Sequence, residues 1–479
     1  MILNIENLIA DHENWLWIIS IFVLPYVVAE LALFFTVLVK SNRYWSSDKK
    51  KLQLSDNTPL APISVLVPAF NEEKVVVEAI KSILKSGNSE TEVIVINDGS
   101  TDNTIEVLKN SFELVPAHHL PRDILSSSPV KQVLLSKTYP NLKVIDKLLS
   151  GKGKADALNT GIGYARNELV CVVDADSMLE ADSLKRLSQP FKANPETVAV
   201  GGAVRCGNSR KKILPFRGFN PLIWAQDIEY ARIFYMDRVV LSSFNLNYII
   251  SGAFGMFRRT ALLAVGGYRS NLAEDMDLTL RLHRYFREAN VPYSISHAPK
   301  ATCWTEVPFN LEIFKKQRSR WHAGFVQGVL GHLDIVGHKK FGGFGKVILP
   351  YCSLTLLEPF FVAMSLMLTI TGLMLPEFKM PIILAFIGAH VLFSLTYLQA
   401  LVLLERQNDK PSRGRVARDY ICWLLFGKFF DGLSFVLRLF GFLKFFRKET
   451  SWGKMERRGM VRDYKITPTQ TISSKRVEA

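Results

Sequence analysis

The stretch ISVLVPAFNEEKVVVEAIKSILKSGNSETEVIVINDGS, residues 63–100, contains two short apolar runs with a helix-like segment between them. The runs ISVLVPAF and EVIVIND are continuously apolar, as is typical of strands buried on both faces. Between them, the apolar positions 76, 79, 80, 83 and 84 recur with helical spacing and indicate an amphipathic helix. A strand, a helix and a second strand in this order predict a βαβ unit.

The alternation of strand-like and helix-like segments continues further along the chain. Buried strands are predicted at LKVID (142–146), LVCVVDAD (169–176) and VAVGGAVR (198–205), and a helix at STDNTIEVLKN (100–110). Residues 112–140, with their prolines and serines, break the rhythm and predict a loop or an ordered excursion. We therefore expect an α/β fold with a mostly parallel sheet that binds its ligands at the carboxyl ends of the strands.

Three long apolar segments are predicted to cross a membrane. Residues 15–39, 347–375 and 382–404 are each long enough to span the roughly 30 Å hydrocarbon core as a helix. Buried core helices are the alternative, but they rarely stay apolar on every face for more than about 20 residues. Residues 1–14 lack a basic region and no small-residue cleavage site follows, so we expect a permanent anchor rather than a signal peptide.

A fourth apolar segment, residues 420–446, is interrupted by charged side chains. Each charge at the centre of a bilayer costs about 2.5–3.5 kcal/mol on insertion scales. An amphipathic helix lying in the membrane interface is therefore favoured over a fourth span. The interrupting residues are Lys428, Asp431, Arg438 and Lys444.

The chain is basic, and the position of the charge indicates its cause. The formal net charge is +15, from 59 Lys and Arg against 44 Asp and Glu, and residues 405–479 contain 17 of the former and 8 of the latter. A nucleic acid partner is not expected, because the charge flanks membrane segments and the positive-inside rule explains it. The rule predicts residues 1–14 outside, and the middle region and the basic tail, 447–479, in the cytoplasm. The five cysteines are scattered, which fits a reduced compartment without a cysteine metal cluster.

Polar side chains follow the first two predicted strands. VPAFNEE (67–73) and NDGSTDNT (97–104) both place them where a strand gives way to a loop, which is where a doubly wound sheet builds its site. Asp98, followed by Gly99, would expose a carboxylate at a sharp turn. A simple turn and helix cap is the structural alternative.

Asp174 and Asp176 end the strand predicted over residues 169–176. Residues two apart on a strand point to the same side, so the two carboxylates are expected to share a face and to need a cation between them. A hard divalent cation, Mg²⁺ or Mn²⁺, suits such a pair, whereas a solvated strand end is the alternative. Magnesium commonly shares its shell with phosphate oxygens, which indicates a phosphorylated substrate, and we expect a diphosphate.

GKGKADALNTG (151–161) adds Lys152 and Lys154 just before a helix-like stretch. The segment lacks the spacing of a P-loop, and the first strand is not followed by G-x-G-x-x-G. An ATPase and a dinucleotide oxidoreductase are therefore not expected.

Two later motifs contain further candidate groups. In AEDMDLTLRLHR (273–284), carboxylates begin a helix, where they either complement the helix dipole or supply a general base. In QRSRW (317–321), a helix would place Gln317, Arg320 and Trp321 on one face. An arginine can hold a diphosphate and a tryptophan can stack on a sugar ring, whereas a juxtamembrane helix is the structural alternative.

Taken in order, these motifs resemble those of the membrane-integrated glycosyltransferases of family 2. That group includes cellulose, hyaluronan, chitin-oligosaccharide and poly-N-acetylglucosamine synthases. The resemblance covers residues 60–330 and the flanking spans, and rests on VPAFNEE, NDGS, GKADALN, DADS, the ED of AEDMD, and Q-x-x-R-W. It implies a cytoplasmic GT-A domain, a Rossmann-like nucleotide-diphospho-sugar transferase fold, inserted between transmembrane helices in a bacterial inner membrane.

The resemblance also implies roles for individual residues in an inverting transfer from a UDP-sugar, such as UDP-glucose or UDP-N-acetylglucosamine. Asp275 would be the general base that deprotonates the acceptor hydroxyl. Asp174 and Asp176 would hold the metal ion, Mg²⁺ or Mn²⁺. The nucleotide sugar would be bound by Asn71, Glu73, Asp98, Lys154, Asp174 and Arg320, and the acceptor by Gln317 and Trp321.

Three functions are compatible with these expectations. The leading hypothesis is a synthase that extends an extracellular polysaccharide and helps to pass it across the membrane. The best-known polymer synthases have more membrane helices after Q-x-x-R-W, so a homo-oligomer, an export subunit or a lipid acceptor could complete this system. The alternatives are a non-processive transferase acting on a lipid, and a membrane anchor or transporter that only binds nucleotides.

Overall fold

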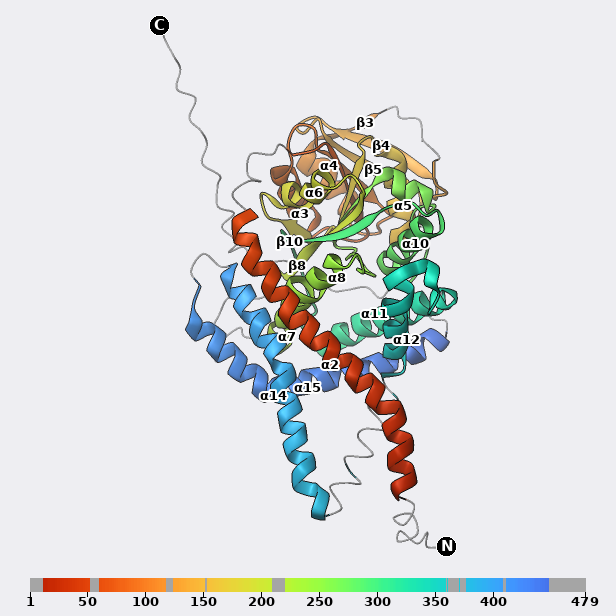
Figure 1. The fold of residues 1–479 in the computed structure, drawn as a ribbon. Coiled ribbons are helices and arrows are strands. Elements are labelled where there is room, and N and C mark those ends of the chain that lie inside the picture. Colours follow the sequence, from red (N-terminus) through yellow and green to blue (C-terminus); the bar gives the residue numbers. More distant parts are fainter. Residues whose placement is uncertain are drawn as a thin grey trace.

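The structure is a computed structural model, and it describes residues 12–51, 60–117, 124–150, 153–208, 220–358, 360, 370, 376–407 and 411–447. Figure 1 shows a mixed α/β domain at one end, with α11, α12 and α15 packed beneath it and α2 running alongside. Residues 1–11 and 448–479, which include most of the predicted external and basic ends, lie outside the described residues.

The core of the domain is one ten-stranded sheet with the order β3-β4-β5-β2-β1-β6-β9-β8-β10-β7. The central strands β5, β2, β1 and β6 are parallel, whereas β9 is antiparallel to both of its neighbours, β6 and β8. The bounds are β1 Ile63–Ala69, β2 Glu92–Asn97, β3 Leu114–Ala117, β4 Val130–Ser136, β5 Leu142–Lys147, β6 Leu169–Val173, β7 Ser177–Leu179, β8 Thr197–Cys206, β9 Phe254–Arg258 and β10 Ser294–Thr305.

Helices cover both faces of this sheet. Alternate residues of β1 point to opposite sides, so Val65 packs with one hydrophobic cluster and Leu66 with another. The first cluster includes residues of α3 (Val76–Ser86), α4 (Thr104–Phe112) and α6 (Ser183–Ala193). The second cluster includes residues of α5 (Lys154–Tyr164), α9 (Arg259–Ala264) and α10 (Glu274–Glu288).

The structure confirms the predicted α/β fold, but the expectation of a mostly parallel sheet is wrong, because four of the described strand pairings are parallel and five are antiparallel. The segment predicted as a loop or an ordered excursion, residues 112–140, contains two strands, β3 and β4, which pair with each other and extend the sheet beyond β5 in antiparallel fashion. These strands are only half-buried at the sheet edge, so their sequences lack the continuous apolar run of the central strands. His118 and His119, which the sequence assigns to this region, lie outside the described residues.

A second layer of helices lies next to the sheet domain. It comprises α7 (Pro221–Arg232), α8 (Arg238–Ser243), α11 (Leu311–Leu330) and α12 (Leu349–Leu356), with a π-helical turn, Ile233–Asp237, between α7 and α8. Helix α10 joins the layers, because Leu278 packs towards the sheet and Met276 and Leu280 pack with α11 and α12. The start of α10 and one face of α11 are thereby held against each other.

Three long helices contain the apolar segments noted in the sequence: α2 (His12–Lys51), α14 (Pro376–Arg406) and α15 (Arg413–Phe446). Within the described residues, Ile387–Arg406 and Arg413–Phe446 are long and apolar enough to cross a membrane, by length and composition only. The predicted spans 15–39 and 382–404 lie within α2 and α14, whereas much of 347–375 lies outside the described residues. Their insertion in a membrane remains a prediction.

Side-chain contacts attach α2 to the rest of the protein. The Trp45 indole donates a hydrogen bond to the Tyr235 carbonyl (2.9 Å), and Gln399 of α14 donates one to Ser41 (2.9 Å). Phe34 and Phe393 meet edge to face, with ring centroids 5.4 Å apart. Helices α2 and α14 therefore pack together although they lie at opposite ends of the chain.

Two adjacent glycines of β8 give a matched test of packing in the sheet. A Cβ atom at Gly202 would lie 2.2 Å from Cδ1 of the buried Phe254 ring, whereas a Cβ at Gly201 would meet its nearest atoms at 3.5 Å. We expect Gly202→Ala to lower the free energy of unfolding by about 1–3 kcal/mol through overpacking. Gly201→Ala should stay within about 1 kcal/mol of the wild type. Denaturant unfolding of both variants checks this, and equal losses would contradict the packing described here.

Candidate active site

Lys154, the first residue of α5, lies at the centre of the acidic residues gathered at the carboxyl edge of the sheet. Its Nζ atom is 2.5 Å from Oδ1 of Asp174 and 3.6 Å from Oε1 of Glu274. It also donates a hydrogen bond to the Gly252 carbonyl (3.0 Å). One ammonium group thus contacts three chain segments that lie far apart in the sequence.

The charges of this cluster shift the pKa values of its members. Burial by itself lowers the pKa of Lys154, but the neighbouring Asp174 and Glu274 carboxylates outweigh that effect and raise it. Burial raises the pKa of Glu274, although the positive charges of Lys154 and Arg320 oppose the shift. Lys154 therefore stays charged and partly neutralises a site that is rich in carboxylates.

Asp174 and Asp176 lie in the turn between β6 and β7 and not on a strand, because β6 ends at Val173. The side chain of Asp174 is 31% exposed and faces Lys154. Asp176 is buried, and its Oδ1 accepts hydrogen bonds from Ser177 Oγ (3.1 Å) and Thr305 Oγ1 (3.3 Å). The expectation that strand periodicity aligns the two carboxylates is wrong, since the turn determines their directions.

The acidic turn fits a cation whose remaining ligands come from a substrate. Within the described ranges, no group of three or more His, Cys, Asp and Glu side chains could hold a metal ion. Magnesium is usually bound by one or two carboxylates together with phosphate oxygens, and Asp174 and Asp176 can supply that number. The donor set therefore fits a metal whose shell is completed by a diphosphate.

Asp275, in the first turn of α10, is held by two backbone amides. Its Oδ2 accepts a hydrogen bond from Gly252 N (2.9 Å) and its Oδ1 accepts one from Met276 N (2.8 Å). Gly252 thus contacts Asp275 through its amide and Lys154 through its carbonyl. The loop that carries Gly252 fixes the general-base candidate beside Lys154.

The Q-x-x-R-W segment lies on α11, as the sequence predicts. Arg320 donates a hydrogen bond to the Leu272 carbonyl (3.1 Å), and its charge acts on the neighbouring Glu274. The Trp321 side chain is partly exposed, with the Arg318 guanidinium 4.9 Å from its ring centroid. Oε1 of Gln317 is buried and has no hydrogen-bond partner among the described residues.

Arg318, at a variable position inside this motif, has a structural role that the sequence analysis missed. It forms two hydrogen bonds with the Glu229 carboxylate of α7, of 2.8 and 2.5 Å, and it also stacks over Phe314. This pairing holds α11 against α7 and orients the guanidinium beside Trp321. Since Glu229 is about 90 residues earlier in the chain, nothing in the local sequence indicates the pair.

Asp98 takes part in a buried ionic network that the sequence analysis also missed. The fully buried Lys147 bridges Asp98 and Asp156, and Ser150 Oγ donates a hydrogen bond of 3.0 Å to Oδ2 of Asp98. Burial alone would raise the pKa of Asp156, but the Lys147 hydrogen bond and charge outweigh it and lower that pKa. Lys147 therefore ties the ends of β2 and β5 to the first turn of α5.

Asn71 and Glu73 organise the turn that follows Asp98. Asn71 has a left-handed backbone (φ 58°), and its Oδ1 accepts a hydrogen bond from Thr101 N (2.7 Å). Oε2 of Glu73 accepts one from Asn103 N (3.1 Å). The predicted contacts of both residues with a nucleoside remain predictions, but their hydrogen bonds already fix the loop next to Asp98.

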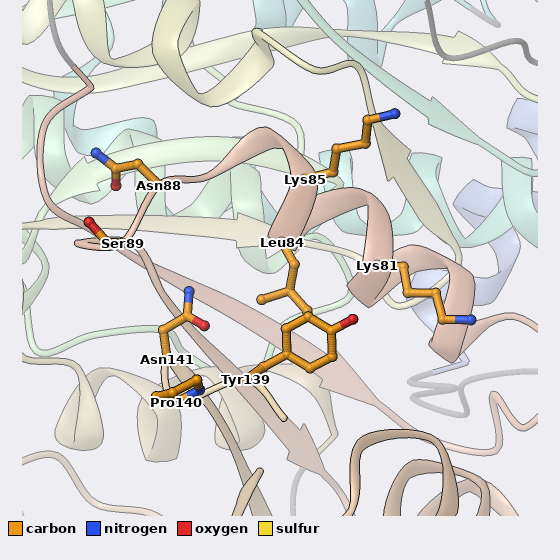
Figure 2. A pocket seen from close by; sticks show the side chains of 8 residues that line it. All are labelled: Lys81, Leu84, Lys85, Asn88, Ser89, Tyr139, Pro140 and Asn141. Atoms are coloured by element: carbon orange, nitrogen blue, oxygen red, sulfur yellow. The ribbon is translucent and has the colours of Figure 1, made fainter. Parts of the chain in front are cut away.

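A cavity of about 490 Å³ lies away from this cluster. Figure 2 shows it between the carboxyl-terminal end of α3 and the turn before β5, at the amino ends of the parallel strands. None of the predicted site residues lines it; the lining residues are Lys81, Leu84, Lys85, Asn88, Ser89, Tyr139, Pro140 and Asn141. The charged cluster at the opposite edge of the sheet is therefore the candidate active site.

Comparisons with known proteins agree with this fold. Residues 64–123 match the model of glycosyl transferase family 2, and residues 169–403 match that of glycosyl transferase family group 2. The solved mannosyltransferase PcManGT from Pyrobaculum calidifontis, in complex with GDP-Man and Mn²⁺, is similar in fold, with a TM-score of 0.52 at 18% identity. The likeness covers 88% of this chain and 99% of that one.

Two similar curated proteins are poly-beta-1,6-N-acetyl-D-glucosamine synthases. The protein of Staphylococcus epidermidis is 31% identical over 271 residues, 56% of either chain. The protein of Staphylococcus aureus (strain COL) is 27% identical over 313 residues, 65% of either chain. The chain thus matches less than two thirds of the length of these relatives.

The mixed sheet, with charged groups at its carboxyl edge, defines a GT-A-like sugar-transferase fold. The matched segments show that the chain belongs to glycosyltransferase family 2. The resemblance of the ordered motifs to this family is confirmed, whereas integration in a membrane stays a prediction.

The buried Lys147 network predicts a large effect of one substitution. Lys147→Met would leave the Asp98 and Asp156 carboxylates buried without their shared cation. Removing one partner of a buried ion pair typically costs about 3–5 kcal/mol, so we expect a loss of that size in the free energy of unfolding. Lys137→Met, at an exposed position after β4, is the control and should change it by less than about 0.5 kcal/mol.

The Lys147 network also predicts that the stabilisation it provides depends on pH. Because the pKa of Asp156 is lowered on folding, its ion pair stabilises the protein fully above the unfolded-state value of about 4. That stabilisation is lost as the pH falls through the lower folded-state pKa. The difference between wild type and Lys147→Met should therefore shrink at acidic pH in denaturant unfolding. A difference that stays constant down to about pH 2 would contradict the assignment.

Proposed function

We propose that the protein is a membrane-anchored enzyme that transfers a sugar from a UDP-sugar to a growing polysaccharide. N-acetylglucosamine is the first candidate for that sugar. The observation that carries the proposal is the single cluster around Lys154. Lys154 contacts Asp174 of the acidic turn and Glu274 of α10, and Gly252 forms hydrogen bonds with both Lys154 and Asp275. The choice of sugar and product is supported by the names of the similar Staphylococcus synthases.

In this proposal Asp275 accepts the proton of the acceptor hydroxyl. The hydroxyl oxygen attacks the anomeric carbon of the donor sugar while the bond from that carbon to the diphosphate oxygen breaks. A single displacement of this kind inverts the anomeric centre and needs no protein nucleophile. The amides of Gly252 and Met276 hold the carboxylate of Asp275 in place, which favours a fixed proton acceptor over a freely rotating one.

Cations stabilise the leaving diphosphate in this proposal. Lys154 and Arg320 both lie next to Glu274, so their charges converge on the region where the diphosphate would depart. Asp174 and Asp176 would hold a divalent cation, which supplies further charge stabilisation when bound. Asp98, with its loop fixed by Asn71 and Glu73, would contact the nucleoside.

The acceptor would bind along α11. The partly exposed Trp321 ring, oriented beside Arg318, offers a flat apolar face for a sugar. Oε1 of Gln317, which lacks a partner among the described residues, could accept a hydrogen bond from a sugar hydroxyl. The GT-A-like domain would face the cytoplasm, with α2 and α14 in the bilayer of the inner membrane.

A panel of labelled nucleotide sugars, incubated with membranes that contain the full chain, tests the proposed function. We expect incorporation from UDP-N-acetylglucosamine into a product of high molecular weight. Only short glycolipid products would instead indicate the lipid-acceptor alternative. Absence of transfer from every donor would contradict the proposed enzyme.

Asp275→Asn separates catalysis from donor binding. The amide keeps the size of the side chain but cannot take up the proton, so we expect kcat to fall by at least about 100-fold. The dissociation constant of UDP, measured by calorimetry, should stay within about threefold of the wild-type value. Asp334→Asn, at an exposed carboxylate paired with Arg284, is the matched control and should retain full activity. Normal turnover by Asp275→Asn would contradict its role as the base.

Asp176→Ala tests the metal site. Loss of one of two proposed carboxylate ligands should remove the enhancement of UDP binding by Mg²⁺ or Mn²⁺, while binding measured in EDTA should be little changed. Metal enhancement of UDP binding equal to that of the wild type would count against this assignment.

A further inference from the structure

One face of α10 carries three polar side chains that bind the same loop. Asp275, Thr279 and His283 are each four residues apart, so they lie one above another on the helix. Thr279 and His283 are fully buried. Each of the three side chains forms a hydrogen bond with the backbone of residues 247–252, the loop that contains Gly252.

The loop and the helix run in opposite directions along this face. Their hydrogen bonds pair Asp275 with Gly252 (2.9 Å), Thr279 with Ile250 (3.2 Å) and His283 with Asn247 (2.8 Å). Four helical residues advance about 6 Å, and two residues of extended chain advance about 6.6 Å. A spacing of four on the helix therefore suits the backbone repeat of a chain segment that runs beside it.

The hydroxyl group of Thr279 joins this loop to the candidate base. Its oxygen accepts a hydrogen bond from Ile250 N, and its proton is donated to the backbone carbonyl of Asp275 (2.7 Å). Because a hydroxyl has a single proton to donate, both of its directions are fixed. One buried side chain thus contacts the loop and the residue whose carboxylate would accept the acceptor's proton.

His283 anchors the other end of the loop and is itself held in place. A carbonyl oxygen can only accept, so Nε2 of His283 donates to Asn247 and Nδ1 accepts from the Tyr293 hydroxyl (2.7 Å). Burial lowers the pKa of His283 to about 4, so the ring stays neutral near neutral pH. The ring also stacks on that of Phe344, with centroids 4.1 Å apart.

Arg238, the first residue of α8, adds a contact from a second helix. Its guanidinium donates a hydrogen bond to the Ile249 carbonyl (2.6 Å) and lies 5.4 Å from the ring centroid of Tyr248. The loop itself belongs to no helix or strand. Its position is therefore determined by side chains of α8 and α10.

The loop passes these contacts on to the candidate active site. Gly252 donates its amide to Asp275 and accepts a hydrogen bond from Lys154, so a displacement of the loop would move both charged groups. A Cβ atom at Gly252 would lie only 3.1 Å from Nζ of Lys154, which shows how closely the backbone approaches the lysine. The separation of the base from the central cation thus depends on where the loop is held.

We propose that Thr279 is a positioning residue of the transfer reaction. It ties the 247–252 loop to the backbone of Asp275, so that Gly252 keeps Asp275 and Lys154 in fixed positions. The effect on catalysis rests on the proposed function, whereas the anchoring of the loop does not.

Hydrogen–deuterium exchange of the full chain in detergent tests the anchoring. Thr279→Val keeps the shape of the side chain but removes both of its hydrogen bonds, and it leaves the buried Ile250 amide without its partner. We expect the amides of Ile250 and Gly252 to exchange at least about tenfold faster than in the wild type. Wild-type exchange of these amides in Thr279→Val would overturn the proposal.

Thr160→Val is the matched control for this substitution. The buried Thr160 hydroxyl, on α5, also donates to the carbonyl four residues earlier, that of Asp156 (2.9 Å), but within the described residues it forms no hydrogen bond with the loop. Exchange of the loop amides in Thr160→Val should equal that of the wild type. Equal acceleration in both variants would contradict a specific role of Thr279.

Turnover and donor binding together test the positioning role. We expect Thr279→Val to lower kcat about tenfold or more, because small misplacements of reacting groups cost rates of that order. The dissociation constant of UDP should stay within about threefold of the wild-type value. Thr279→Ser keeps the hydroxyl and should retain kcat within about twofold. Wild-type kcat in Thr279→Val, or equal losses in the Val and Ser variants, would overturn the positioning role.

The two measurements separate failure of this inference from failure of the proposed function. Exchange needs no substrate, so it decides the anchoring of the loop even where no donor sugar is transferred. A fall in kcat without faster exchange of the loop amides would overturn the claim that Thr279 acts through the loop.

Discussion

The concentration of negative charge at the carboxyl edge of the sheet is the constraint around which this site is arranged. Asp174 comes from the turn after β6, whereas Glu274 and Asp275 begin α10, and they can share one edge because Lys154 supplies a central positive charge. A similar arrangement recurs at the end of β2, where Lys147 joins two buried carboxylates. Lys154 begins α5 and Lys147 ends β5. In both places the lysine holds strands and helices together through its carboxylate partners and so creates a charged site.

The second determinant is the packing of α10 and α11. Helix α10 contacts the sheet with one face and α11 with another, so Asp275 and Arg320 belong to one packed unit. Helix α11 in turn is held by α7, through Arg318 and Glu229, and by α15, through Ser319 and Gly441. The candidate site at the carboxyl edge of the sheet and the buried face of α15 are therefore joined by one continuous set of packed helices.

Much of the fold could be predicted because buried parallel strands leave a strong local signal. The runs beginning at Ile63, Glu92, Leu142, Leu169 and Val198 are mainly apolar, and each contains a strand whose bounds lie within one residue of the prediction, except that β6 ends at Val173 and not at Asp176. The half-exposed strands β3 and β4 have no such signal and were missed. The acidic turn was misplaced onto a strand, since the apolar run before Asp174 does not reveal where pairing with β9 ends.

The sequence by itself determined the family, the order of the motifs and the candidate residues, because each motif is a local string whose chemistry can be recognised without coordinates. Only the tertiary structure decided which of these residues meet. The contact of Lys154 with Glu274 spans 120 positions and that of Ser319 with Leu437 spans 118, distances over which side-chain pairing leaves no periodic trace. Such contacts depend on how whole helices dock, and docking is determined by shape and burial summed over many residues and not by any one segment.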